Sequence, residues 1–131
     1  MEIKTFVNNP VPSNCFLIIK DEHVIVVDPG SKDCSELITY IKSKKFIVDY
    51  IILTHDHFDH VWGADKLRGE FDAPIVCSGI CKNKLSIPQN YFNLLYYEDN
   101  TYFKIDNIEF IISDNSSIEW MNEKILFITT P

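Results

Sequence analysis

The amino-acid sequence alternates between short apolar runs and segments whose apolar residues recur at helical spacing. The runs predict strands over residues 15–19, 24–27, 48–53 and 73–76. Helical spacing predicts helices over residues 36–43, capped by Ser31 or Ser35, and over residues 64–69. The run at 48–53 is almost entirely apolar, which indicates a strand buried on both faces of a sheet. Strands separated by helices in this way predict an α/β fold with a mixed sheet.

The second half of the chain is less regular. Further strands are predicted over residues 102–105, 108–113 and 125–129. Residues 78–100 are predicted to be helical in part. Residues 85–102 could serve as a substrate cap, a dimer contact or an ordinary helical stretch, and the pattern does not decide among these roles.

Composition and charge narrow the class of protein. The chain has 131 residues, of which 46% are hydrophobic, and this predicts one globular domain over residues 1–131. The net charge of −7 argues against nucleic acid as a partner, because binding to phosphates relies on basic patches. We expect neither a membrane span nor a secretory signal, and no membrane partner. The four cysteines are then predicted to be reduced thiols in a cytoplasmic protein.

The segment at residues 54–60, THDHFDH, carries the candidate chemistry. It holds three of the four histidines of the chain within six residues. Given the His and Asp content of the chain, about 3 in 10,000 such chains would contain the pattern His-x-His-x-Asp-His by chance. The segment also follows a predicted buried strand, and the loop at the carboxyl end of such a strand is a common position for a functional site.

Metal binding is the chemistry that these residues favour. Imidazole nitrogen and carboxylate oxygen are suitable ligands for zinc, iron or manganese. His55 and His57 lie two residues apart in an extended segment and can bind one ion, while Asp59 and His60 can reach a second ion. Two such ions can share a hydroxide that is a nucleophile at neutral pH. The alternative is a solvated loop in which Asp59 caps a helix.

The sequence resembles the metallo-β-lactamase superfamily, and within it the glyoxalase II-like hydrolases. The residues that carry the likeness are 14–18 (NCFLI), 27–30 (VDPG), 51–60 (IILTHDHFDH), 63–64 (GA), 73–76 (APIV) and 128–131 (ITTP). The resemblance implies the N-terminal half of an αββα sandwich, with a mixed sheet and flanking helices. It also implies a cytosolic hydrolase of a small-molecule acyl substrate, such as a thioester or lactone, that acts through a metal-bound hydroxide.

The resemblance also implies roles for individual residues. His55 and His57 would bind one metal, and Asp59 and His60 the other, with Asp59 as the catalytic candidate. Zinc is the expected metal, with iron or manganese as alternatives. Asp28 would support the histidine loop, although an aspartate that simply forms the turn before Pro29 is the alternative.

No substrate-binding residue is assigned. Phe58 is expected to pack in the interior, and His23 is expected to be exposed and uninvolved.

In the family, the pair matching Thr130-Pro131 precedes Gly-His, and that histidine is the third ligand of the first metal. The sequence therefore predicts an incomplete ligand set, weak metal binding and impaired catalysis. It also predicts an apolar sheet face left open, and a homodimer formed through that face. The alternatives are a truncated, non-catalytic remnant and a half-domain that is completed by a separate chain.

Overall fold

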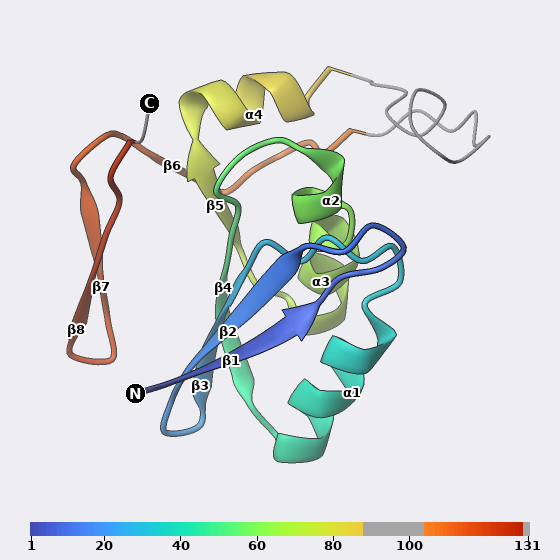
Figure 1. Cartoon of the computed structure of the whole chain (residues 1–131). Helices are drawn as coiled ribbons and strands as arrows, with labels where there is room; N and C mark the ends of the chain where they lie inside the picture. The colour runs from blue at the N-terminus through green and yellow to red at the C-terminus, as the bar shows by residue number, and fades with distance from the viewer. Residues whose placement is uncertain (88–103, 130–131) are drawn as a thin grey trace.

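The computed structural model describes residues 1–87 and 104–129 of the chain. The elements in these residues are, in chain order, β1 (Glu2–Val7), β2 (Asn14–Lys20), β3 (His23–Val27), α1 (Ser35–Lys44), β4 (Ile47–Ile52), α2 (Phe58–Val61), α3 (Ala64–Phe71), β5 (Ile75–Ser78), α4 (Gly79–Leu85), β6 (Phe110–Ile112), β7 (Ser117–Trp120) and β8 (Glu123–Leu126) (Figure 1).

Strands β1 to β6 form one mixed sheet in sequence order. The pairs β1–β2 and β2–β3 are antiparallel, and Lys20 pairs with His23 across a turn of two residues. The pairs β3–β4, β4–β5 and β5–β6 are parallel. Helices lie in the connections between the parallel strands, as parallel pairing requires. The predicted α/β fold with a mixed sheet is confirmed.

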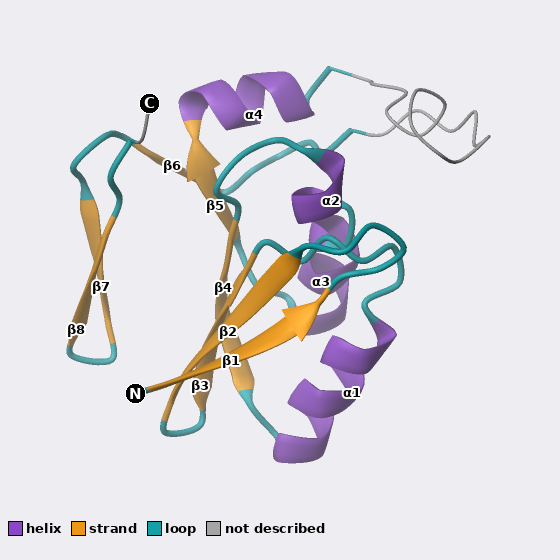
Figure 2. Cartoon of the chain, in the orientation of Figure 1, coloured by secondary structure: helices purple, strands orange, loops and turns teal. Residues whose placement is uncertain are grey.

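One face of the sheet is covered by helices α1, α2 and α3 (Figure 2). The core on this side joins alternate residues of the strands to the inner faces of the helices. It includes Leu17, Val26 and Ile51 from the sheet, together with Ile41 and Leu67 from the helices. These five side chains are completely buried. Alternation along β3 sends Ile25 to the opposite face, and β4, whose register with β3 shifts after Val48, sends Tyr50 and Ile52 there.

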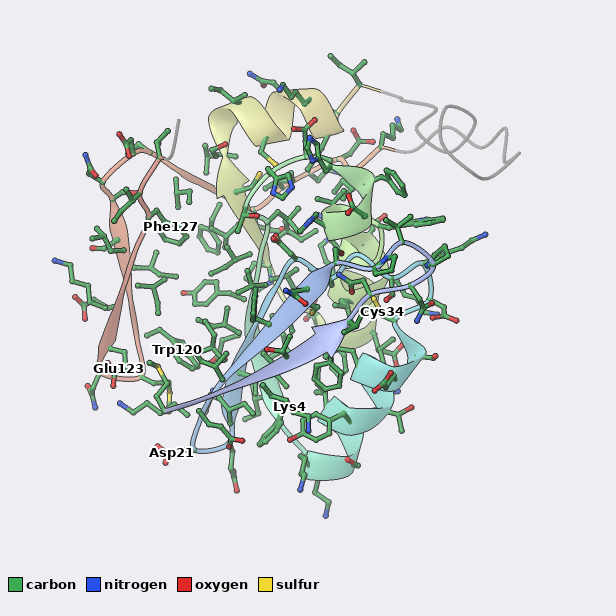
Figure 3. The ribbon with its side chains drawn as sticks, in the orientation of Figure 1. Lys4, Asp21, Cys34, Trp120, Glu123 and Phe127 are labelled. Atoms are coloured by element: carbon green, nitrogen blue, oxygen red, sulfur yellow. The ribbon has the colours of Figure 1, made fainter. Side chains whose placement is uncertain are left out.

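That opposite face is partly covered by the hairpin of β7 and β8, contrary to the expectation of an open face (Figures 1 and 3). Trp120 of the hairpin is 4% exposed and packs with Ile25, Ile52 and Val76 of the sheet. Figure 3 shows Trp120 and Phe127 between the hairpin and the sheet. The sequence did not predict β7, because an alternation of polar and apolar residues over only four positions is too short to stand out. A homodimer stays a prediction. The hairpin leaves less of the apolar sheet face available to a second copy than the sequence predicted.

Polar contacts fix the hairpin at its turn. Asp49 Oδ2 on β4 accepts a hydrogen bond from Trp120 Nε1 (2.8 Å) and lies 2.7 Å from His23 Nδ1. Lys20 Nζ lies 3.1 Å from Glu123 Oε1 on β8. The expectation that His23 is exposed is therefore wrong, because His23 begins β3, contacts Asp49 and has a side chain that is only 32% exposed.

Three further local predictions need correction or qualification. Neither Ser31 nor Ser35 caps α1, because the N-cap residue is Cys34, in left-handed conformation with no side-chain cap bond. Residues 104–105 are not part of a strand, and the rest of the prediction for 102–105 lies outside the described residues, as does most of the segment 85–102. The structure shows Phe58 buried, as predicted.

Two further predictions concern the cysteines, expected to be reduced thiols, and the expected absence of a membrane span. Cys15, Cys34, Cys77 and Cys81 are all buried free thiols. Burial raises the pKa of Cys34 to about 11, so this thiol is protonated and unreactive at neutral pH. Within residues 1–87 and 104–129, no helix is both long and apolar enough to cross a membrane.

Replacement of Trp120 by alanine should lower the free energy of unfolding by about 3–5 kcal/mol, because it removes the side chain that buries the sheet face under the hairpin. Leu126→Ala is the matched control on β8: Leu126 is 54% exposed, and its loss should cost about 0.5 kcal/mol or less. Urea unfolding measures both values. Equal effects of the two variants would contradict the packing described for the hairpin.

Candidate metal centre

The candidate site lies where two neighbouring parallel strands end. Asp28 directly follows β3, and the histidine loop begins two residues after β4. The Asp28 amide donates to the Ile52 carbonyl (3.0 Å), which holds the ends of the two strands together. Asp28 has a φ of 56°, a left-handed conformation that aspartate tolerates better than most residues. The backbone thus brings Asp28 next to the loop.

The three histidines of the motif gather in one cluster. The ring centroids of His55 and His57 lie 4.6 Å apart, and those of His55 and His60 lie 4.2 Å apart. His57 is the N-cap of the short helix α2, which carries His60 in its last turn. Asp59 Oδ2 lies 3.7 Å from His60 Nε2. The four residues predicted to bind metal are therefore linked as neighbours, with His57 beside His55, His55 beside His60 and His60 beside Asp59.

Asp28 supports this loop through three contacts of its carboxylate, and it is only 5% exposed. Oδ1 accepts a hydrogen bond from the Thr54 amide (2.8 Å), and Oδ2 accepts one from the Thr54 hydroxyl (2.6 Å). Oδ2 also lies 3.0 Å from His60 Nδ1. Because an ionised carboxylate only accepts, Nδ1 of His60 carries the proton, and Nε2 keeps the lone pair that a metal needs.

Thr54 determines in the same way which ring nitrogen of His55 carries the proton. Its hydroxyl proton points to Asp28, so the hydroxyl oxygen accepts a hydrogen bond from His55 Nδ1 at 2.8 Å. Nε2 of His55 is then also left with its lone pair. Thr54 is not among the site residues predicted from the sequence. Its only signal was a hydroxyl residue directly before the first histidine of the motif.

The electrostatics of the cluster favour a neutral imidazole at His55. Burial lowers the pKa of His55, and the positive charge that His60 can carry lowers it further, while the negative charge of Asp28 acts in the opposite direction. A neutral imidazole is the form that binds a metal ion.

The donor atoms fit a transition-metal ion. Two ligands of a tetrahedral zinc ion, each about 2.0–2.1 Å from it, lie about 3.4 Å apart, close to the Asp59–His60 separation of 3.7 Å. Atoms of Asp28, His55 and His60 also lie within 4.8 Å of one another. Both oxygens of Asp28 already accept hydrogen bonds, which suits a supporting residue better than a ligand. The metal roles themselves stay predictions.

The main chain of the loop lies directly against Gly30, the residue two after Asp28. A Cβ added at Gly30 would collide with the carbonyl group of Asp59 and lie 2.9 Å from Asn8 Nδ2. Only glycine allows this approach. Gly30 therefore sets the position of the helix that carries Asp59 and His60, a role that the Asp-Pro-Gly turn alone did not reveal.

Comparison with known proteins agrees with this geometry. The sequence profile of the Metallo-beta-lactamase superfamily matches residues 8–80, more than half of the chain and the whole of the site. The chain belongs to this superfamily. The family predicted from the sequence is confirmed.

Relatives and solved structures of the superfamily extend the comparison. A hydroxyacylglutathione hydrolase from Psychromonas ingrahamii is 43% identical over 65 residues, which are 47% of this chain and 25% of the relative. The B3 metallo-β-lactamase BLEG-1 superposes with a TM-score of 0.81 at 22% identity, covering 94% of this chain and 58% of its own. The protein TTHA1623, solved in a di-iron-bound form, gives a TM-score of 0.74 at 18% identity, with coverage of 88% and 56%.

The solved structures and the curated relatives support different conclusions. At such low identity the solved structures establish the fold alone, and they confirm the metallo-β-lactamase-like arrangement. The chain spans between 19% and 38% of the length of the curated relatives compared with it.

Gly30→Ala should destabilise the chain by about 1–3 kcal/mol or more, because the added methyl group must push the Asp59 backbone away. Gly69→Ala is the matched control: Gly69 lies in α3 with open space around it, and alanine there should stabilise the helix by about 1 kcal/mol. Thermal unfolding measures both. A neutral Gly30→Ala variant would refute the close packing of the loop.

Proposed function

We propose that this chain provides the metal-binding half of a hydrolase that cleaves an acyl bond of the thioester or lactone type. The observation that carries the proposal is the cluster of His55, His57, Asp59 and His60 at the carboxyl end of the sheet. The likeness to a hydroxyacylglutathione hydrolase supports the acyl substrate class. Membership of the superfamily supports metal dependence.

In the proposed site, His55 and His57 hold one ion, and Asp59 and His60 hold a second. Zinc is the proposed metal, and iron is the alternative that the di-iron form of TTHA1623 favours. When bound, such ions lower the pKa of a water molecule and polarise the acyl carbonyl.

In this proposal the residues of the chain hold the metal-binding imidazoles and orient the attacking water. Asp28 and Thr54 hold the imidazoles of His60 and His55 with Nε2 available. The Asp59 carboxylate places a negative charge and a hydrogen-bond acceptor beside His60 Nε2, where it can orient the attacking water. Fixed groups of this kind need little rearrangement during the reaction.

Metal content and hydrolysis test the proposal together. The chain is freed of metal with a chelator, reloaded with zinc, dialysed and assayed against a thioester and a lactone. His57→Ala should lower both the metal affinity and the rate by about 100-fold or more, because it removes a proposed ligand.

His23→Ala is the matched control, because His23 contacts Asp49 on β4, outside the histidine cluster. It should keep both properties within about 3-fold, as expected for a residue outside the site. If the chain retains no zinc after reloading and dialysis, the proposal is overturned. Equal metal affinities and rates for His57→Ala and His23→Ala would also overturn it. A chain that binds zinc without hydrolysing either substrate would favour a non-catalytic metal-binding half-domain.

Thr54→Val tests how the imidazoles are held. Valine keeps the shape of threonine but removes the hydroxyl between Asp28 and His55, so zinc affinity should fall about 10- to 100-fold. Thr54→Ser keeps the hydroxyl and should restore most of the affinity. Competition with a chromogenic chelator measures both variants, and equal affinities would show that the hydroxyl has no part in holding His55.

A further inference from the structure

A buried polar cluster, formed far from the motif in sequence, contacts the backbone of Asp59. Its centre is Asn8, which directly follows β1 and is only 4% exposed. The Asn8 Nδ2 group donates to Ser13 Oγ (2.9 Å) and to the Asp28 carbonyl (3.1 Å), and it lies 3.4 Å from the Asp59 carbonyl. On the other side, Asn8 Oδ1 accepts from Ser31 Oγ at 3.3 Å.

The orientation of the Asn8 amide follows from its neighbours. The carbonyl oxygens of Asp28 and Asp59 both face Nδ2. A flipped amide would bring its own oxygen against these two acceptors. The two Nδ2 protons therefore point towards the site, and the side chain acts there as a donor.

Ser13 completes the contact with the loop. Its hydroxyl accepts from Asn8 and donates to the Asp59 carbonyl. That carbonyl needs an outside donor because helix α2 ends too early: the Gly63 amide, which would donate to Asp59 in a longer helix, donates to the Pro29 carbonyl instead (2.8 Å).

The Asp59 carbonyl is therefore held by donors and by close packing. Asn8 and Ser13 provide the donors. Gly30 packs directly against the same carbonyl group, since its missing Cβ leaves the space that this carbonyl occupies. The Asp59 side chain branches from this held segment of main chain, and its carboxylate oxygen Oδ2 lies 3.7 Å from His60 Nε2.

We infer that Asn8 and Ser13 are positioning residues that hold the Asp59 carboxylate in place for metal binding. They act through the Asp59 main chain, 51 and 46 residues away in sequence. The inference rests on the proposed function, since it assigns these residues to the ion that Asp59 and His60 would share. Supporting groups of this kind typically change metal affinity by about 10- to 100-fold.

Cobalt titration tests the inference, because Co²⁺ takes similar ligands and its visible spectrum reports their arrangement. Asn8→Ala and Ser13→Ala should each weaken binding of the second Co²⁺ ion by about 10- to 100-fold and alter its spectrum. Asn9→Ala, at the neighbouring exposed position, is the matched control and should leave both unchanged. Ser13→Thr keeps the hydroxyl and should restore binding.

A double-mutant cycle separates positioning from a general loss of structure. If Asn8 acts through Asp59, Asn8→Ala should have no further effect on Co²⁺ binding in an Asp59→Ala background. Equal losses in both backgrounds would overturn the inference. So would Asn8→Ala and Ser13→Ala variants that bind Co²⁺ as Asn9→Ala does.

Hydrogen exchange of the metal-free chain gives a readout that needs no metal. Amides of residues 58–63 should exchange faster in Asn8→Ala and Ser13→Ala than in Asn9→Ala, because the loop loses its donors. Unchanged exchange would overturn the inference. If the wild-type chain binds no Co²⁺, the proposed function fails, and exchange alone then decides whether Asn8 and Ser13 hold the Asp59 segment.

Discussion

The arrangement of the site depends on one buried carboxylate, that of Asp28. A charge in the interior is costly unless hydrogen bonds compensate it, and here the Thr54 amide, the Thr54 hydroxyl and His60 Nδ1 all face the carboxylate. These partners come from the loop after β4, whereas Asp28 follows β3. The need to satisfy the carboxylate therefore ties the histidine loop to the sheet, and the same bonds orient the imidazoles. The contacts of Asp28 with Thr54 and His60 therefore both stabilise the fold and orient the imidazoles of the candidate site.

The motif could be predicted because it is local in sequence. Residues 54–60 alone carry the ligand types and spacing that identify the family, and the strand before them is marked by its apolar run. The structure then places Asp28 beside His60, as a supporting role requires. The ligand roles of the histidines and Asp59 stay predictions.

What the sequence did not reveal depends on contacts between distant residues. Asn8 and Ser13 lie in a loop that resembles any polar turn, and Gly30 is one glycine of a common Asp-Pro-Gly turn. Their importance arises only when the Asp59 carbonyl packs against them. Of the hairpin, only a strand over residues 125–129 was predicted, and it overlaps part of β8. The short strands of the hairpin have weak patterns, and Trp120 becomes a core residue only because Asp49 and the sheet lie opposite it.

The close spacing of the imidazoles has an electrostatic cost, because protonated imidazoles repel one another. The His55 ring centroid lies 4.6 Å from that of His57 and 4.2 Å from that of His60, and a proton on His60 opposes a second proton on His55. The carboxylates of Asp28 and Asp59 act in the opposite direction, but two negative charges do not balance three protonated imidazoles. A histidine cluster contributes little to a hydrophobic core, and the three residues are at least partly exposed. The arrangement fits the two proposed cations, which the neutral imidazoles and Asp59 would hold, because such ions turn closely spaced lone pairs from a source of repulsion into a set of ligands.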